Sequence, residues 1–410
     1  MEETPNMKIT RRLLFVLLAI LLAGFLVPPS HAVQLSQCAV QQPPEAPNQP
    51  VLPPCIYVTD STNNRVLVFS TQTGNFLFQF GSTGTGSGQF KTPIGIAVAF
   101  DGTVLVADSA NSRIQAFDPD GHFIRQFGNS GTGPGRLITP TGVAVTALPQ
   151  AIAAAQTKIA VSPFNIYVTD FANNRVVVFD STGHFVFAFG STGTGSGQFK
   201  GPWGINAGPV FGGIPGSPTG SLDGVAATGA LFVTDQNNSR VQMFDTDGNF
   251  LGKFGASGTG PGNLLMPTGI STVLDLEDDC GDCETAPIIL PPMLVMVADG
   301  ANNRVNVYQA EFDFSLNRWT FQYLYKFGSL GTGPGQLSSP LGMFGLSLSS
   351  GFPVAVFGTD GNNHRVELFL ALPDSASFAT KLGTFGTGPG QFVTPAGVAM
   401  APTLVVTLLN

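Results

Sequence analysis

Charged side chains, histidine and cysteine are all scarce in this chain. Of its 410 residues, 11% are Asp, Glu, Lys or Arg, while four are His and four are Cys. So few histidines leave little material for a histidine-bound metal centre. The net charge is −8 at pH 7, and no basic run is present that would neutralise the phosphates of a nucleic acid. We therefore expect no nucleic-acid partner.

One apolar run lies near the N-terminus, at residues 13–27, after the basic residues Lys8, Arg11 and Arg12. Its length is short for a membrane helix, which needs about 20 residues. A basic start, an apolar middle and a small-residue site at Ser30-His31-Ala32 are typical of a signal peptide. We predict cleavage after Ala32, so residues 1–32 are the signal peptide and no stable membrane span remains. A retained anchor is the alternative, and the expected location is secreted, periplasmic or cell-surface.

Glycine and phenylalanine are abundant, with 51 and 34 residues, and they follow a pattern that occurs six times. Each copy has an Asp-x-x-Asn-x-Arg turn, two short strands, a glycine-rich loop and a Pro-x-Gly element. The Asp and Arg of the six turns are Asp60 and Arg65, Asp108 and Arg113, Asp170 and Arg175, Asp235 and Arg240, Asp299 and Arg304, and Asp360 and Arg365. A long repeat built of short strands and turns predicts a β-propeller.

Each copy predicts a blade of four strands, rich in Val, Ile and Phe and bounded by turn residues. The chain starts with the last three strands of one blade and ends with a first strand at 395–400, so we expect pairing of the N- and C-terminal strands to close the ring. The copies resemble NHL repeats over residues 55–410. That resemblance implies an all-β, six-bladed propeller of four-stranded blades. Residues 33–54, rich in Pro and Gln, predict an extended linker.

The loop lengths differ between the two faces of the predicted disc. From the Phe of Phe-Gly to the Pro of Pro-x-Gly the offset is 13 in five copies, but 10 from Phe385 to Pro395. The connections on the other face vary, with insertions at 143–169, 205–234 and 270–298. Because length variation is typical of tolerated or functional loops, we predict that the features specific to this protein lie on this second face.

The polar motifs favour structural over chemical roles. An active site occurs once, whereas the Asp-x-x-Asn-x-Arg turn occurs six times, so we predict that its Asp and Arg hold the turn. The glycine-rich loops lack the Lys of a phosphate-binding loop. The turns at 118–121 and 245–248 begin like a calcium loop but lack its closing Glu. We predict no catalytic residue, no metal ligand and no cofactor. Binding of a divalent cation in the channel stays open as an alternative.

The central residue of Pro-x-Gly is expected near the mouth of the propeller channel. The six are Ile94, Thr141, Trp203, Thr268, Leu341 and Ala396. Trp203 is the large aromatic among them and the candidate binding residue, able to stack on a sugar or a peptide, with packing as the alternative.

The four cysteines predict disulfides in an exported protein. We prefer the local pairs Cys38–Cys55 and Cys280–Cys283, and the two other pairings stay open. A zinc site would need a second pair with metal spacing, which Cys38 and Cys55 do not provide.

These observations predict a non-enzymatic binding or scaffold module outside the cytoplasm, with a protein, peptide or glycan partner. The alternative is a metal-dependent lyase or lactonase with its site in the central channel. Propellers related to NHL proteins include a lyase with a histidine-bound zinc, which the three scattered histidines after residue 32 do not reproduce.

Overall fold

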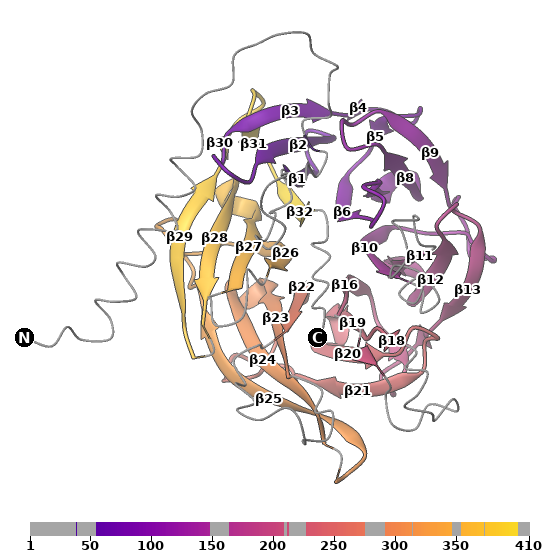
Figure 1. Cartoon of the computed structure of the whole chain (residues 1–410), viewed down its shortest axis with the longest axis vertical. Coiled ribbons are helices and arrows are strands. Elements are labelled where there is room, and N and C mark those ends of the chain that lie inside the picture. The colour runs from indigo at the N-terminus through magenta and orange to yellow at the C-terminus, as the bar shows by residue number, and fades with distance from the viewer. Residues whose placement is uncertain are drawn as a thin grey trace, which may run out of the picture.

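The computed structural model describes Cys38 and residues 55–147, 164–208, 211–212, 227–274, 292–313, 315–346, 354–372 and 374–400. These residues form six four-stranded antiparallel sheets around a central axis, as Figure 1 shows. The predicted all-β, six-bladed propeller is confirmed. The predicted signal peptide and the linker, except for Cys38, lie outside the described residues. Cys280, Cys283 and residues 401–410 lie outside them as well.

Each blade runs from an inner strand beside the axis to an outer strand at the rim (Figure 1). Blades 1 to 3 are β32 (Pro395–Met400), β1 (Cys55–Asp60), β2 (Arg65–Ser70) and β3 (Phe76–Phe80); β6 (Pro93–Val98), β7 (Val104–Asp108), β8 (Arg113–Phe117) and β9 (Phe123–Phe127); and β10 (Pro140–Ala147), β11 (Phe164–Asp170), β12 (Arg175–Asp180) and β13 (Phe185–Phe189). Blades 4 to 6 are β16 (Pro202–Ala207), β19 (Leu231–Asp235), β20 (Arg240–Phe244) and β21 (Phe250–Phe254); β22 (Pro267–Leu274), β23 (Met293–Asp299), β24 (Arg304–Asp313) and β25 (Arg318–Phe327); and β26 (Pro340–Leu346), β27 (Val354–Asp360), β28 (Arg365–Ala371) and β29 (Ala376–Leu382).

The connections add short elements. The turn between the second and third strands contains a 3-10 helix in blades 2 to 6, namely η1 (Ser109–Asn111), η2 (Phe171–Asn173), η4 (Gln236–Asn238), η5 (Gly300–Asn302) and η6 (Gly361–Asn363). Three glycine-rich loops carry small parallel ladders, β4 (Ser82–Thr83) with β5 (Gln89–Phe90), β14 (Ser191–Thr192) with β15 (Gln198–Phe199), and β30 (Thr384–Phe385) with β31 (Gln391–Phe392). A further hairpin pairs β17 (Phe211–Gly212) with β18 (Ala227–Thr228).

The ring closes between the two ends of the described chain. β32 pairs antiparallel with β1, with Ile56 opposite Met400 and Val58 opposite Val398. The predicted closure is therefore confirmed. Closure leaves the propeller without a long open sheet edge between its first and last blades, which limits edge-to-edge association.

The core lies between the blades, because each sheet buries both faces against its neighbours. In blade 2, for example, every residue of β7 and β8 is buried. The Phe that ends an outer strand packs on the aromatic ring of the next blade's third strand, with centroids 4.5–5.0 Å apart at five of the six junctions. Burying a large apolar side chain of this kind stabilises a fold by about 1.5–3 kcal/mol.

Leu382, not Phe385, occupies the sixth position of this aromatic series. Leu382 lies opposite Val366, as Phe80 lies opposite Val66, and it shares a core cluster with Phe69. The offset from Leu382 to Pro395 is then 13, as in the other five copies. The shorter last loop expected from the sequence is therefore wrong, because the strand ends at Leu382 and the pair Phe385-Gly386 lies within the loop.

Blade 5 departs from the others in its outer half. β24 and β25 have ten residues each and form a hairpin that extends beyond the ring (Figure 1). The additional residues of this blade therefore continue the sheet, which pairs as far as Asp313 opposite Arg318. Among the described residues, no helix is long and apolar enough to span a membrane.

Candidate functional site

The Asp and Arg of the six repeated turns form ion pairs, buried in five blades and partly exposed at Arg175 in blade 3. The distance from Arg Nε to Asp Oδ2 is 2.7–3.2 Å in all six blades. The Asn between them donates from Nδ2 to the same carboxylate oxygen, as Asn111 does to Asp108 at 2.9 Å. With its charge balanced inside the repeat, this motif offers no free carboxylate for chemistry.

Each ion pair also holds the glycine-rich loop that arrives from the preceding blade. In blade 2, Arg113 Nη2 donates to the carbonyl oxygens of Gly86 and Gln89, both at 2.8 Å. Asp108 Oδ1 accepts the backbone N–H of Lys91 at 2.7 Å. The motif therefore joins adjacent blades, a role beyond the turn that its sequence predicts.

The pair Asp60 and Arg65 makes these contacts across the closure of the ring. Arg65 donates to the carbonyl oxygens of Thr387 and Gln391, both at 2.7 Å. Asp60 Oδ1 accepts the N–H of Thr394 at 3.0 Å. These partners lie more than 320 residues apart in sequence, so this ion pair ties the last loop to the first blade.

One blade places a carboxyl group where others place an amide. Seven residues after the motif Asp, Gln115 and Gln242 donate from Nε2 to that Asp and to a loop carbonyl oxygen. Blade 6 has Glu367 at this position, fully buried, with Oε1 2.7 Å from Nη2 of Arg365. Burial raises the pKa of Glu367 to about 7, against the attraction of Arg365 and with the repulsion of Asp360.

The channel along the axis is lined by the six Pro-x-Gly elements. Each opens the inner strand with a register shift, such as that between Pro93 and Ile96, and the extra residue turns this segment toward the axis. The cavity has a volume of about 60 Å³ and is lined by Ile, Leu, Val, Met, Ala, Gly, Thr and Trp, none of them ionisable. This volume is below the roughly 300–1,000 Å³ that is typical of a pocket for a small organic ligand.

Steric contact requires the Gly of Pro-x-Gly. A Cβ atom on Gly204 would lie 2.3 Å from the carbonyl oxygen of Thr268 in the next blade, and the other five glycines face the equivalent oxygen at 2.3–2.7 Å. In four blades a Thr hydroxyl bridges the same junction. Thr234 Oγ1, for instance, accepts from the Gly204 N–H at 2.7 Å and donates to the Thr268 oxygen at 2.8 Å.

Trp203 lies at the channel, as its place in Pro-x-Gly predicts, and its side chain is partly exposed. Its ring packs edge-on against Phe171 of η2 in the preceding blade, with centroids 5.6 Å apart. Its carbonyl oxygen accepts from the hydroxyl of Thr169 at 2.7 Å. The backbone is therefore fixed by the blade junction, while part of the ring stays available to a partner.

The face of the disc that bears the Asp-x-x-Asn-x-Arg turns and the glycine-rich loops is hereafter the uniform face. Three exposed apolar side chains lie there, with exposed fractions of 69% for Leu330, 65% for Phe385 and 47% for Met266. Other copies have Ser or Thr at the positions of Leu330 and Phe385, and Ser, Thr or Gly at that of Met266. The fold therefore does not require apolar side chains at these positions.

Family comparisons agree with this geometry. Residues 90–117 match the NHL repeat, and residues 51–102 and 221–273 match a family described as a 6-bladed beta-propeller. The chain is a six-bladed β-propeller, and part of it matches the NHL repeat. None of the curated proteins matches it.

Similar solved structures include a streptogramin B lyase, at 12% identity over 84% of this chain and 83% of that one, with a TM-score of 0.45. A protein of unknown function from Bacteroides caccae has 13% identity, coverage of 84% and 97%, and a TM-score of 0.47. The virginiamycin B lyase from Staphylococcus aureus has 13% identity, coverage of 87% and 94%, and a TM-score of 0.42. At these TM-scores, the likenesses carry no argument about activity.

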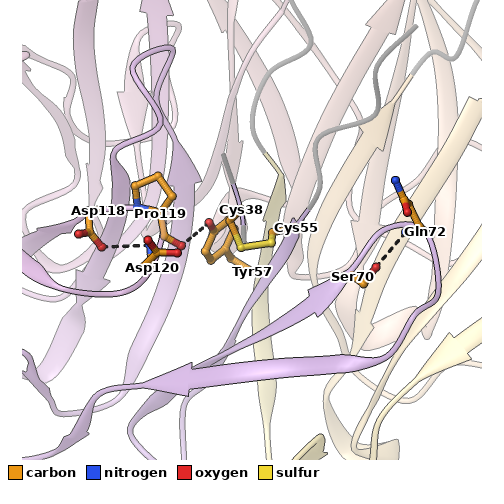
Figure 2. The surroundings of a disulfide bond; sticks show 8 residues. All are labelled: Cys38, Cys55, Tyr57, Ser70, Gln72, Asp118, Pro119 and Asp120. Atoms are coloured by element: carbon orange, nitrogen blue, oxygen red, sulfur yellow. Dashed lines mark hydrogen bonds between the residues drawn. A yellow bond between two sulfur atoms is a disulfide. The ribbon is translucent and has the colours of Figure 1, made fainter. Parts of the chain in front are cut away.

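The propeller contains a disulfide between Cys38 and Cys55, which joins the segment before the propeller to the start of β1. Figure 2 shows it beside Tyr57, whose hydroxyl donates to the carbonyl oxygen of Pro119 in blade 2 at 2.8 Å. Both cysteines are buried in the core cluster between blades 1 and 2. This pair matches the preferred pairing.

The described histidines of the propeller lie apart. His122 and His184 are exposed in turns between the outer two strands, and the hydrogen bond that the His122 ring donates to the Asp118 carboxylate raises the pKa of His122. His364 packs on Phe385 with ring centroids 4.6 Å apart. Within the described residues, no group of three or more His, Cys, Asp or Glu side chains can hold a metal ion.

Reading the motifs alone missed Glu367 and the exposed Met266, Leu330 and Phe385. The signal that finds them is a comparison of the six copies at every position, including the loop positions between the motifs. The six loops align at every position when the last one is counted from Leu382, which ends β29.

Proposed function

We propose that this propeller is a non-enzymatic binding module that acts outside the cytoplasm and engages a protein, peptide or glycan on its uniform face. The observation that carries the proposal is the set of exposed Met266, Leu330 and Phe385. The other copies of this loop have the same backbone arrangement with Ser, Thr or Gly at these positions. The apolar side chains are therefore not needed for the fold. Exposed apolar groups on a rigid scaffold are typical of interaction sites.

The channel supports binding at the surface over chemistry on the axis. Among the described residues that line it, none carries a carboxylate or imidazole, the groups that a metal-dependent lyase or lactonase would need, and its volume is about 60 Å³. Trp203 lies at the channel with part of its ring exposed, beside Phe171. This aromatic pair therefore extends the apolar surface toward the axis.

A location outside the cytoplasm is supported by the signal-like N-terminus and by the Cys38–Cys55 disulfide, since disulfides persist in oxidising compartments. N-terminal sequencing of the protein recovered from its host tests this part. A first residue of Val33 is expected, and a chain that keeps residues 1–32 in the cytoplasm would contradict it.

The binding proposal is tested with the triple variant Met266→Thr, Leu330→Thr and Phe385→Thr, which installs a residue that other copies carry at each position. Parent and variant are compared on peptide and glycan arrays, with Ile124→Thr as the control for an exposed apolar side chain on an outer strand. We expect the triple variant to keep its melting temperature and lose the bound probes, while the control keeps both. A triple variant that binds like the parent would overturn the proposal.

A further inference from the structure

The uniform face is positively charged, although the whole chain has a net charge of −8. The six Asp and six Arg of the repeated turns neutralise one another in their ion pairs. The six glycine-rich loops, at 81–92, 128–139, 190–201, 255–266, 328–339 and 383–394, add Lys91, Arg136 and Lys200 and contain no acidic residue. All three cationic side chains are exposed.

The opposite face carries the acidic residues. Acidic residues lie in or next to the turns between the outer two strands of blades 2 to 5, namely Asp118, Asp120, Asp180, Asp245, Asp247 and Asp313, the last of them opposite Arg318. Charge is thus separated between the two sides of the disc. A separation of this kind orients an approaching charged partner and selects its sign.

The three cations depart from what the loop itself needs. At the position of Arg136 the other copies have Gln or Asn, and in four of them the Gln Oε1 accepts a backbone N–H within the same loop, such as that of Gly86 at 3.0 Å. Lys91 and Lys200 share a position that is Ile, Leu, Ser or Val elsewhere. Their backbone N–H groups are held by Asp108 and Asp235 at 2.7 Å, so both side chains start from a fixed backbone.

The cationic and apolar positions follow one another around the face. Lys91, Arg136 and Lys200 lie in the loops that lead into blades 2, 3 and 4, while Met266, Leu330 and Phe385 lie in the loops that lead into blades 5, 6 and 1. The cationic set ends at Lys200, and the aromatic Trp203 follows three residues later. One half of the ring of loops therefore suits anionic groups and the other half suits apolar groups.

We propose that the partner is a polypeptide segment with acidic side chains toward one end and aromatic or aliphatic side chains toward the other. This inference rests on the proposed binding function and names its partner class. The acidic end lies over Lys91, Arg136 and Lys200, and the apolar end lies over Met266, Leu330 and Phe385. A neutral glycan would use the apolar half and leave the cations without a partner.

The test is a selection of displayed random peptides on the immobilised, disulfide-intact protein. We expect the enriched peptides to be net acidic, with acidic and apolar residues in separate stretches. Enriched peptides that are basic or uncharged would overturn the inference and leave the binding module standing. If no peptide of any composition is enriched, and the glycan array is also blank, both proposals fail.

A charge variant provides the second readout. The charge variant combines three substitutions by residues that other copies carry, Lys91→Ser, Arg136→Gln and Lys200→Ser. The matched control is Lys253→Gln, at an exposed position on β21. We expect the charge variant to bind an enriched peptide about tenfold more weakly at low salt and to lose most of its salt dependence. Unchanged affinity in this variant, or tighter retention of single-stranded RNA than of the acidic peptide by the parent, would overturn the inference.

Discussion

Replacing Glu367 by Gln should remove a pH dependence from the stability of this propeller. Glu367 is fully buried beside Arg365 and Asp360, at the position where Gln115 and Gln242 donate an amide hydrogen to the motif Asp. A neutral carboxylic acid can supply a similar hydrogen, whereas a carboxylate brings a second negative charge against Asp360. The folded protein therefore holds the proton of Glu367 more tightly than the unfolded chain does.

The magnitude follows from the raised pKa. Burial raises the pKa of Glu367 from 4.5 to about 7, and the linkage relation converts that difference into about 3 kcal/mol of unfolding free energy. Because the folded-state pKa is the higher one, this stability is present below pH 4.5 and is lost as the pH rises to 7. The Gln variant has no proton to lose, so its advantage over the parent should grow from near zero to about 3 kcal/mol across this window.

Urea unfolding at pH 4.5, 5.5, 6.5 and 8, followed by fluorescence with the disulfide intact, measures this difference. Gln242→Glu provides the reciprocal control in blade 4, since it places a carboxyl group beside Asp235 and should introduce the same loss of stability above neutral pH. A difference between parent and Glu367→Gln that stays constant from pH 4.5 to 8 would refute the reasoning.

Three further predictions concern the closure and packing of the ring. Arg65→Gln removes one partner of a buried ion pair and should cost about 3–5 kcal/mol of unfolding free energy, seen as a lower melting temperature and faster proteolysis at the chain ends. Arg175→Gln, at a more exposed pair within the ring, should cost less. Equal losses in the two variants would count against a special role of Arg65 in closure. Gly204→Ala should destabilise the propeller by about 1–3 kcal/mol because its Cβ meets a carbonyl oxygen of the next blade. An unchanged melting temperature would contradict this and would mean that the inner strands of the two blades move apart without cost. Reducing the Cys38–Cys55 bond, or replacing both residues by Ala, should cost about 3 kcal/mol from the closed loop, and equal urea midpoints for the oxidised and reduced forms would contradict this.

The sequence alone determined the fold, because the elements of a blade recur at nearly constant spacing. Six Asp-x-x-Asn-x-Arg turns, six Pro-x-Gly elements and a terminal first strand at 395–400 were enough to predict six blades and their closure. The turn and strand preferences that carry this prediction act over a few residues. Trp203 could likewise be placed at the channel from its position in the repeat.

Tertiary structure decided what the repeats touch. Arg65 holds the loop around Gln391 through a contact between blades. Leu382 takes the place of a Phe because of the register of its strand. Local sequence patterns encode neither of these features. The burial of Glu367 beside Asp360 also depends on the neighbouring loop. The opposite charge of the two faces appears when distant loops are brought to one side of the disc, because a charge acts through its place in space and not through its place in the chain.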